Sequence, residues 1–485
     1  MTSTPGWFRT NREEAAEPPS GGAGGQRPRV LIIYASAGAG HDGASRELAH
    51  RLRERGLLAD CVDLADIFPW RLGRLLRGTY HGMLSRLPWI YGLLFSIGGN
   101  FSRAAPITRA LLRPVWPRVL EALPADTRAV VSTYPVVSQI VGPLRREGRL
   151  AVPVITYLTD FAVNPIWVSP GVDVHCAAHV TTRAEARALG AGEVRVAGRM
   201  VSAAFRPGDE EEKRRVRERL GLPVDARLAL LVAGSWGVGA VARTAAEIAD
   251  TGVAVPVVVC GRNTALYRRL RRRGTGYVFG WVEDMPALLR AADVLVENAG
   301  GLTALEAMAC GLPVATYRPI PGHGRANAAT MARAGVATWV RRRADLGPTL
   351  LRLADGTGGQ RQRSAGLALF DTDPAGVVAD IARGITASAT PSRLAEAGPA
   401  GRPPLGPVPV DDPVLRESAS FLETSVPVEG AVPAEVRAGL AAATPRRTLT
   451  RWVGLRAGMA RLWTGVDQPH RDGGNRPANR PDRRG

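Results

Sequence analysis

The sequence lacks most features of a secreted, membrane-spanning or metal-binding protein. It has only four cysteines, and no two of them have the spacing of a metal site or a redox motif. We therefore expect core thiols in a reducing cytoplasm. No apolar run approaches the roughly 20 residues that span a bilayer, and the start of the chain lacks the apolar core of a signal peptide. The sequence predicts a protein that is made and kept inside the cell.

Lysine is almost absent, since Lys213 is the only one among 63 basic residues. With 44 acidic residues, the formal net charge is still +19. This excess favours an anionic partner, which is nucleic acid, acidic lipid or a phosphorylated substrate. No nucleic-acid recognition motif accompanies the charge, so we expect no nucleic-acid partner. The preference for arginine also fits the codon bias of a GC-rich genome, so it carries no functional argument.

The length of 485 residues and a hydrophobic content of 45% indicate two domains with appendages. Residues 1–27 are rich in Gly, Pro and Glu and predict a disordered tail. Residues 28–205 and 206–384 each alternate short apolar strands with amphipathic helices, which predicts two Rossmann-like α/β domains. Residues 385–485 predict a mostly disordered tail. Its basic amphipathic segment at 446–463 is either a membrane anchor or a solubilising stretch.

Apolar runs bounded by turn residues locate the strands, and a 3.6-residue period locates the helices. A helix is expected at 285–291, and the charge run at 209–219 predicts a solvated helix face. The expected strands are 30–34, 58–62, 128–132, 152–157, 193–197, 228–233, 256–260, 276–280 and 293–296.

Residues 292–314 are the most informative stretch. A short apolar strand turns through Gly300 and Gly301 into a helix. Glycines let a phosphorylated ligand approach the backbone, where the N–H groups and dipole of the helix favour an anion. The stretch therefore predicts a seat for a nucleotide diphosphate. The structural alternative is a capping box, in which Thr303 caps the helix and Glu306 reaches back to the N–H of the cap residue.

Two further glycine turns stand between a strand and a helix. His41 follows a glycine turn after the first strand, at the entrance of a helix. The positive end of the helix dipole disfavours a proton on imidazole there, which suits a base. A polar cap or a surface position is the alternative for a lone histidine. Asp160 lies at the carboxyl end of another strand, where ligands bind in open α/β sheets, and Gly234 to Gly239 form a third glycine turn.

Residues 67–101 differ in character from the rest of the chain. Arginines interleave with tryptophan, tyrosine and phenylalanine, and the apolar part is too short to cross a membrane. Basic and aromatic residues on an amphipathic segment suit the headgroup interface of an anionic membrane. A helical insertion that packs on its own domain is the alternative.

Together these motifs resemble a known family. The glycine turn before His41, Thr159-Asp160-Phe161 with Trp167, the Gly234 turn, and the stretch from Asn298 through Glu306 to Pro313 occur in the order found in the monogalactosyldiacylglycerol synthase and diacylglycerol glucosyltransferase family. That family is similar to the MurG enzymes and belongs to glycosyltransferase family 28. The likeness runs from about residue 30 to about residue 340.

The resemblance implies a GT-B fold, in which two Rossmann-like domains face each other across a cleft. It also implies a hexosyltransferase that moves galactose or glucose from a UDP-sugar to a lipid hydroxyl with inversion, in glycolipid synthesis. Diacylglycerol is the expected acceptor, no metal or other cofactor is expected, and the protein would lie peripherally on the inner face of the plasma membrane. Two rivals are a UDP-sugar 2-epimerase on the same fold and a catalytically weakened lipid- or nucleotide-binding homologue.

The resemblance also implies roles for individual residues. His41 would be the base or would position the acceptor, and Asp160 would orient His41 or the acceptor. Main-chain N–H groups would hold the phosphates, Glu306 would accept the ribose hydroxyls, and the segment from 279 to 285 would meet the uracil. The implied donor-binding residues are Gly40, Gly234, Ser235, Gly237, Val282, Met285, Gly300, Gly301, Thr303, Glu306, His323 and Asn327.

The sequence departs from the family pattern at several positions. Asn164 stands where the family usually has histidine, and Arg199 follows Gly198 where proline is usual. His323-Gly324 stands where a Gln-Glu or Gln-Gln pair often contacts the donor sugar. His323 can donate one hydrogen bond and Gly324 has no side chain. We therefore expect the hydroxyl pattern of the sugar to be read differently here.

Overall fold

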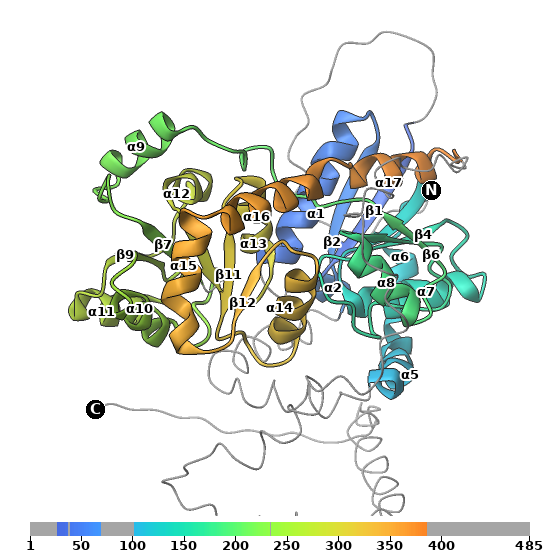
Figure 1. Ribbon diagram of the computed structural model, residues 1–485. Helices are drawn as coiled ribbons and strands as arrows, with labels where there is room; N and C mark the ends of the chain where they lie inside the picture. Colours follow the sequence, from blue (N-terminus) through green and yellow to red (C-terminus); the bar gives the residue numbers. More distant parts are fainter. Residues whose placement is uncertain (1–26, 37–38, 69–100, 233, 386–485) are drawn as a thin grey trace, which may run out of the picture. The chain divides into compact units, whose positions relative to one another are not determined.

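The structure is a computed structural model, and it describes residues 27–36, 39–68, 101–232 and 234–385 (Figure 1). The aromatic and basic stretch after residue 68 and the basic segment at 446–463 lie outside the described residues, as do nearly all of the two predicted tails. None of the helices in the described ranges combines the length and apolar character that a membrane span requires.

The first half of the described chain builds a six-stranded sheet in the order β2-β1-β3-β4-β5-β6, with every neighbouring pair parallel. Parallel neighbours need crossover connections, and helices supply them. The strands are β1 Arg29–Tyr34, β2 Leu58–Asp63, β3 Thr127–Ser132, β4 Val154–Tyr157, β5 Val174–Ala177 and β6 Glu193–Val196. The helices are α1 Ala39–Glu54, α2 Leu64–Ile67, α5 Phe101–Leu112, α6 Trp116–Glu121, α7 Pro135–Arg146 and α8 Val180–Ala188.

The second half builds another six-stranded parallel sheet, in the order β12-β11-β10-β7-β8-β9. Its strands are β7 Leu228–Val232, β8 Val255–Val259, β9 Tyr277–Phe279, β10 Val294–Glu297, β11 Val314–Tyr317 and β12 Thr338–Val340. The helices are α9 Glu210–Arg219, α10 Val241–Asp250, α11 Thr264–Arg273, α12 Met285–Ala291, α13 Leu302–Ala309, α14 His323–Arg333, α15 Leu346–Ala354, α16 Thr357–Leu367 and α17 Pro374–Ala382.

These two parallel α/β sheets confirm the predicted fold class. Every predicted strand is present within a few residues, and helix α12 has the predicted bounds. The charge run forms helix α9, whose N-cap Asp209 accepts a hydrogen bond from the N–H of Glu212 at 2.7 Å. Strands β5, β11 and β12 are not among the predicted strands. Each of them contains a polar residue, His175 in β5, Thr316 in β11 and Thr338 in β12, which shortens its apolar run.

The core lies on both faces of each sheet. In β1, Val30 and Ile32 pack toward helix α1, whereas Leu31 and Ile33 pack on the opposite face with helix α7. This alternation follows from the two-residue period of a strand. Helix α17, whose residues fall in the predicted range 206–384, packs on the first sheet beside helix α1 (Figure 1). The predicted limits of the domains themselves stay predictions. All four cysteines are unpaired and at least partly buried, as expected for core thiols.

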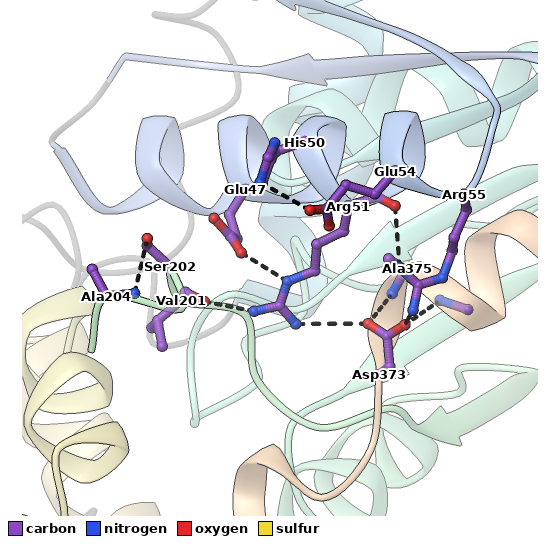
Figure 2. Close-up of polar contacts among 11 residues, drawn as sticks. Glu47, His50, Arg51, Glu54, Arg55, Val201, Ser202, Ala204, Asp373 and Ala375 are labelled. Atoms are coloured by element: carbon purple, nitrogen blue, oxygen red, sulfur yellow. Dashed lines mark hydrogen bonds and ion pairs between the residues drawn. The ribbon is translucent and has the colours of Figure 1, made fainter. Parts of the chain in front are cut away.

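Helix α1 contacts both segments that connect the two sheets. Arg51 donates from Nη2 to the carbonyl oxygen of Val201, 2.6 Å away in the segment between β6 and α9. Its Nη1 lies 3.7 Å from Asp373 Oδ1, and Arg55 also pairs with Asp373 (Figure 2). Asp373 is the N-cap of α17 and accepts the N–H of Ala375 at 3.1 Å. Helix α1, which carries His41 in its first turn, is thereby fixed to both connections.

We expect Asp373→Ala to lower the midpoint of thermal unfolding by several degrees. The change removes a helix cap, worth about 1 kcal/mol, together with two partly buried ion pairs that contribute up to about 1 kcal/mol each. The matched control is Glu211→Ala, which removes an exposed pair with Arg214 on helix α9 and should leave the midpoint nearly unchanged. Equal midpoints for both variants would contradict the role given to Asp373.

Candidate functional site

The predicted site residues gather at the carboxyl ends of parallel strands. His41 follows β1, Asp160 follows β4, Ser235 follows β7, Gly301 follows β10 and His323 follows β11. Because all strands of a parallel sheet end at the same edge, each sheet brings its own predicted residues to one side.

The imidazole of His41 is held in one tautomer. The ring lies in the first turn of α1, and its Nδ1 is 3.1 Å from the carbonyl oxygen of Thr133 and 3.1 Å from Thr159 Oγ1. A carbonyl can only accept, so Nδ1 carries the proton and donates it to Thr133. Nε2 then keeps a lone pair that can take a proton. The edge-on ring of Tyr134, 5.0 Å away between centroids, supports the imidazole from the side.

Asp160 lies beside this arrangement. Its Oδ2 accepts a hydrogen bond from Trp167 Nε1 at 3.3 Å, and its Oδ1 lies 3.5 Å from Asn327 Nδ2. Within the described ranges, the hydrogen bonds that orient the His41 ring come from Thr133 and Thr159. Thr133 was missed by sequence reasoning, although its place directly after β3 is a signal that could have found it. For Asp160, contact with the acceptor remains the predicted role.

Helix α13 begins without a side-chain cap, so the capping box, the structural alternative for this stretch, does not form. Gly301 is the N-cap residue, and Thr303 lies inside the first turn of the helix, where it cannot cap it. The first N–H groups of a helix have no partners within the helix. Since no side chain satisfies the cap, they present a site for an anion, which the helix dipole also favours. Glu306 is thereby released from the structural role that competed with ligand binding.

The turn before this helix is built around a buried carboxylate. Glu297, at the end of β10, accepts the N–H groups of Ala299, at 2.6 Å, and of Gly300. Gly300 has a φ of +67°, and a Cβ there would lie 2.6 Å from Asn327 Cβ, so only glycine fits. The predicted phosphate contact from the N–H of Gly300 is thus taken by Glu297. The N–H groups of Gly301 and of the first turn of α13 are the ones that remain for a ligand.

Asn298 joins this turn to the glycine turn after β7. Its Nδ2 donates to the carbonyl oxygen of Val238 at 2.8 Å, and β7 is the direct neighbour of β10. Gly237 has a φ of +58°, and a Cβ there would lie 3.0 Å from the carbonyl oxygen of Cys260. Gly234 is exposed and Ser235 is partly exposed. A hydrogen bond therefore joins the two predicted phosphate-binding turns.

Glu306 lies in the second turn of α13. Burial raises the pKa of its carboxyl to about 7. The ordinary value is 4.5, so this group changes charge near neutral pH instead of in acid. An ionised carboxylate here could accept two hydroxyl hydrogen bonds, as the predicted ribose contact requires.

The two predicted halves of the site meet at helix starts. A Cβ on Gly40 would lie 3.4 Å from Leu302 Cβ, so the first turns of α1 and α13 touch. Asn327 connects the two sides as well. Its Oδ1 accepts the N–H of Ala162 at 2.9 Å, and its Nδ2 donates to the carbonyl oxygen of Ala299 at 3.1 Å. The loop with Asp160 and the turn before α13 are thereby held together.

Other predicted residues are placed as follows. His323 begins α14, and burial lowers the pKa of its imidazole, which the charge of Asp160 opposes. A Cβ on Gly324 would lie 2.9 Å from the carbonyl oxygen of Asn298, which explains why glycine stands there. Asn164 Oδ1 accepts the N–H of Ile166 at 3.0 Å and so shapes the turn that leads to Trp167.

The predicted uracil segment follows edge strand β9. Val282 and Met285 are partly buried and pack against the core of the second sheet. Asp284 caps helix α12 by accepting the N–H of Ala287 at 3.1 Å. In the ranges that the structure describes, no three His, Cys, Asp or Glu side chains gather in a group that could hold a metal ion.

Two family models match the chain. The model described as monogalactosyldiacylglycerol (MGDG) synthase matches residues 59–198, and the model described as glycosyl transferases group 1 matches residues 230–342. The first covers the loop of Asp160, and the second covers both glycine turns of the second sheet and helix α13.

Curated relatives match over most of their length. A processive diacylglycerol beta-glucosyltransferase from Bacillus mycoides (strain KBAB4) is 27% identical over 386 residues, which cover 73% of this chain and 93% of the relative. One from Bacillus cereus (strain 03BB102) is 26% identical over 385 residues, with the same coverage. Among solved structures, MurG from Acinetobacter baumannii gives a TM-score of 0.44 at 16% identity, covering 74% of this chain and 99% of MurG. The chain is therefore a glycosyltransferase related to the monogalactosyldiacylglycerol synthase and diacylglycerol glucosyltransferase family, as its motifs predict.

Proposed function

We propose that the protein transfers a hexose from a UDP-sugar to the hydroxyl group of diacylglycerol, with inversion at the anomeric carbon. The observation that carries the proposal is the juxtaposition of two helix starts. One presents His41 with a lone pair on Nε2, and the other presents uncapped N–H groups. Leu302 touches the glycine beside His41, so base and anion seat belong to one site.

The base side of the reaction follows from the tautomer of His41. Nε2 removes the proton of the acceptor hydroxyl as its oxygen attacks the anomeric carbon. The bond between that carbon and the diphosphate breaks on the opposite face, and UDP leaves with the electron pair. The imidazolium that forms is stabilised by the hydrogen bond from Nδ1 to the Thr133 carbonyl oxygen, 3.1 Å away. The same bond keeps the ring from turning.

The leaving-group side follows from helix α13. Negative charge grows on the diphosphate in the transition state, and preorganised N–H groups aimed at it stabilise that charge. The N–H groups of Gly301 and Thr303, the helix dipole, and the turn with Gly234 and Ser235 would supply this field. Glu297 and Asn298 hold these turns in shape without a ligand, so little reorganisation is needed.

The donor sugar is proposed from the relatives. Those that match over 93% of their own length are named diacylglycerol beta-glucosyltransferases, which supports UDP-glucose first and UDP-galactose second. His323 and Asn327 would face the sugar, and Val282 and Met285 would border the uracil. The side-chain amide of Asn327 donates to the carbonyl oxygen of Ala299 and lies 3.5 Å from Asp160 Oδ1. The sugar would therefore contact a residue that already takes part in a hydrogen-bond network.

Contact with an anionic membrane would occur through helix α5. Its Ile107 and Leu111 are 61% and 73% exposed. Four residues apart, they lie on the same face of the helix, and exposed Arg113 follows them. Apolar side chains beside arginine suit the headgroup interface. We therefore place the protein peripherally on the inner face of the plasma membrane, where its lipid acceptor resides.

The direct test incubates the protein with a panel of UDP-hexoses and vesicles that contain diacylglycerol, followed by mass analysis of the lipids. We expect one hexose to be added to diacylglycerol, with UDP as the second product. His41→Ala should reduce transfer by about 10²- to 10⁴-fold, the usual contribution of a general base, while UDP binding is unchanged.

The matched control for this assay is His50→Ala, an exposed histidine on the same helix, which should keep full activity. Unchanged transfer by His41→Ala would remove His41 from the mechanism. Conversion of the UDP-sugar without lipid would favour the epimerase, and UDP binding with no turnover would favour a weakened homologue.

Binding of UDP-glucose should weaken as the pH falls from 8 to 6. Glu306 is ionised above its pKa of about 7, and only the ionised form accepts both ribose hydroxyls. Between pH 8 and pH 6, about one unit above and one unit below this pKa, the ionised fraction of the carboxyl falls by about tenfold. The two phosphates of UDP-glucose do not titrate in this range, so calorimetry at each pH isolates the protein group. In Glu306→Gln the affinity should be lower at pH 8 and independent of pH, and a wild-type pH dependence in this variant would exclude Glu306.

Replacing both Ile107 and Leu111 by serine should lower the affinity for anionic vesicles by about tenfold or more. Each side chain contributes roughly 1.5–3 kcal/mol when fully withdrawn from water, and insertion at the interface is partial. Co-sedimentation with vesicles of anionic and neutral lipid measures the effect. Leu351→Ser, at a leucine on α15 that is 42% exposed, is the matched control and should bind normally. Equal binding by both variants would rule out α5 as the contact.

A further inference from the structure

Arg199 is a fully buried cation in the segment that leaves the first sheet. Its side chain is 0% exposed. Among the described residues no ion pair with a carboxylate is found for it, and its Nε and Nη2 also lack a hydrogen-bond partner there. Burying an unpaired charge is costly unless hydrogen bonds compensate for the lost water. This cost raises the question of which part of the structure the guanidinium holds in place.

The guanidinium contacts the loop that follows β4. Nη1 donates to the carbonyl oxygens of Leu158 at 3.1 Å and of Thr159 at 2.6 Å. The guanidinium carbon lies 4.2 Å from the ring centroid of Phe161, a cation–π contact. The loop is thus held by its main chain on one side of Asp160 and by an aromatic ring on the other.

The loop residues that Arg199 contacts lie beside His41 and Asp160, the two groups that the proposed reaction uses. While the carbonyl of Thr159 accepts from Arg199, its hydroxyl lies 3.1 Å from Nδ1 of His41. Asp160 stands between Thr159 and Phe161, which Arg199 contacts through a hydrogen bond and through the aromatic ring. The main-chain N–H of Arg199 also donates to the carbonyl oxygen of Leu369 at 2.9 Å. One residue therefore links the His41 environment to the second connecting segment.

We propose that Arg199 is a positioning residue for the transfer reaction, whose buried guanidinium holds the loop from Leu158 to Phe161 so that Thr159 orients His41 and Asp160 faces the acceptor. The inference rests on the proposed function for its kinetic readout only. In this proposal Arg199 is assigned no contact with the substrate; it acts through its contacts with the loop that carries Thr159 and Asp160.

Arg217 offers a matched control, because it is also a buried arginine that donates to main-chain carbonyls. It is 4% exposed and donates to the carbonyl oxygens of Ala291 at 2.8 Å and Ala226 at 3.0 Å. Unlike Arg199, it pairs with a carboxylate, that of Asp293 at 2.7 Å. None of these partners belongs to the predicted site, so its role is structural.

The test compares Arg199→Met with Arg217→Met in three measurements: steady-state transfer, UDP binding by calorimetry, and hydrogen exchange of the loop peptide. Methionine fills much of the arginine volume without charge, and replacing a buried unpaired charge by an apolar side chain need not destabilise the fold. We expect Arg199→Met to keep its unfolding midpoint and UDP affinity, to lose at least tenfold in kcat, and to exchange faster at residues 158–163. Arg217→Met removes one of the two cations that pair with Asp293 and the hydrogen bonds to Ala291 and Ala226, so it should lower the midpoint and leave kcat per folded molecule unchanged.

Wild-type kcat and wild-type loop exchange in Arg199→Met would overturn the proposal. If Arg199→Met does not fold, Arg199→Lys is tested in its place. The ammonium of lysine cannot make both the hydrogen bonds of the planar guanidinium and its contact with the Phe161 ring. A several-fold lower kcat with normal UDP affinity supports the proposal, and wild-type kcat overturns it. If the wild-type protein transfers no sugar to any lipid, the proposed function fails, and loop exchange alone then shows whether Arg199 holds the loop.

Discussion

The uncapped start of helix α13 is the constraint on which the site depends. Gly301 supplies no side chain at the cap, and the carboxylate of Glu297 accepts the N–H groups of Ala299 and Gly300 instead. Among the described residues no side chain caps the N–H groups that follow, and such a helix start favours an anion such as a diphosphate. A serine or aspartate at this position would satisfy the helix and remove the seat.

Buried polar side chains keep the surrounding loops in shape. Asn298 links the two glycine turns of the second sheet, and Asn327 links the Asp160 loop to the turn before α13. Arg199 also donates a hydrogen bond to the main chain of the loop that carries Asp160. Each of these groups is buried, so each of its hydrogen bonds is costly to break. The loops are thus organised before any substrate binds, which is what electrostatic stabilisation of a leaving group requires.

Much of the fold could be predicted because buried parallel strands are apolar runs, as in Val30 to Ile33 and Leu228 to Val232. Strand β5 escaped prediction because its sequence, Val-His-Cys-Ala, looks polar. In the structure, His175 is 1% exposed, and burial lowers the pKa of its imidazole to about 4, so the ring is a neutral core residue.

Part of the site could be predicted for a similar reason, since glycine turns and a histidine at a helix start leave local patterns. The tautomer of His41, the occupation of the Gly300 N–H by Glu297 and the bridging by Asn327 could not be predicted. They depend on carbonyls and side chains that are distant in sequence, such as Thr133 and Ala162. The capping box, the structural alternative, has the right spacing of Thr303 and Glu306, but the helix starts two residues too early for Thr303 to cap it.

The central claim is that main-chain N–H groups at the start of α13 and in the Gly234 turn hold a diphosphate without a metal ion. Calorimetric titration of the full chain with UDP and with uridine, each in the presence of a chelator, tests it most directly. The account predicts one UDP per chain, bound at least about 100-fold more tightly than uridine, which is roughly 2.7 kcal/mol from the phosphates. Equal affinity for uridine and UDP, or no UDP binding once the chelator is present, would contradict it.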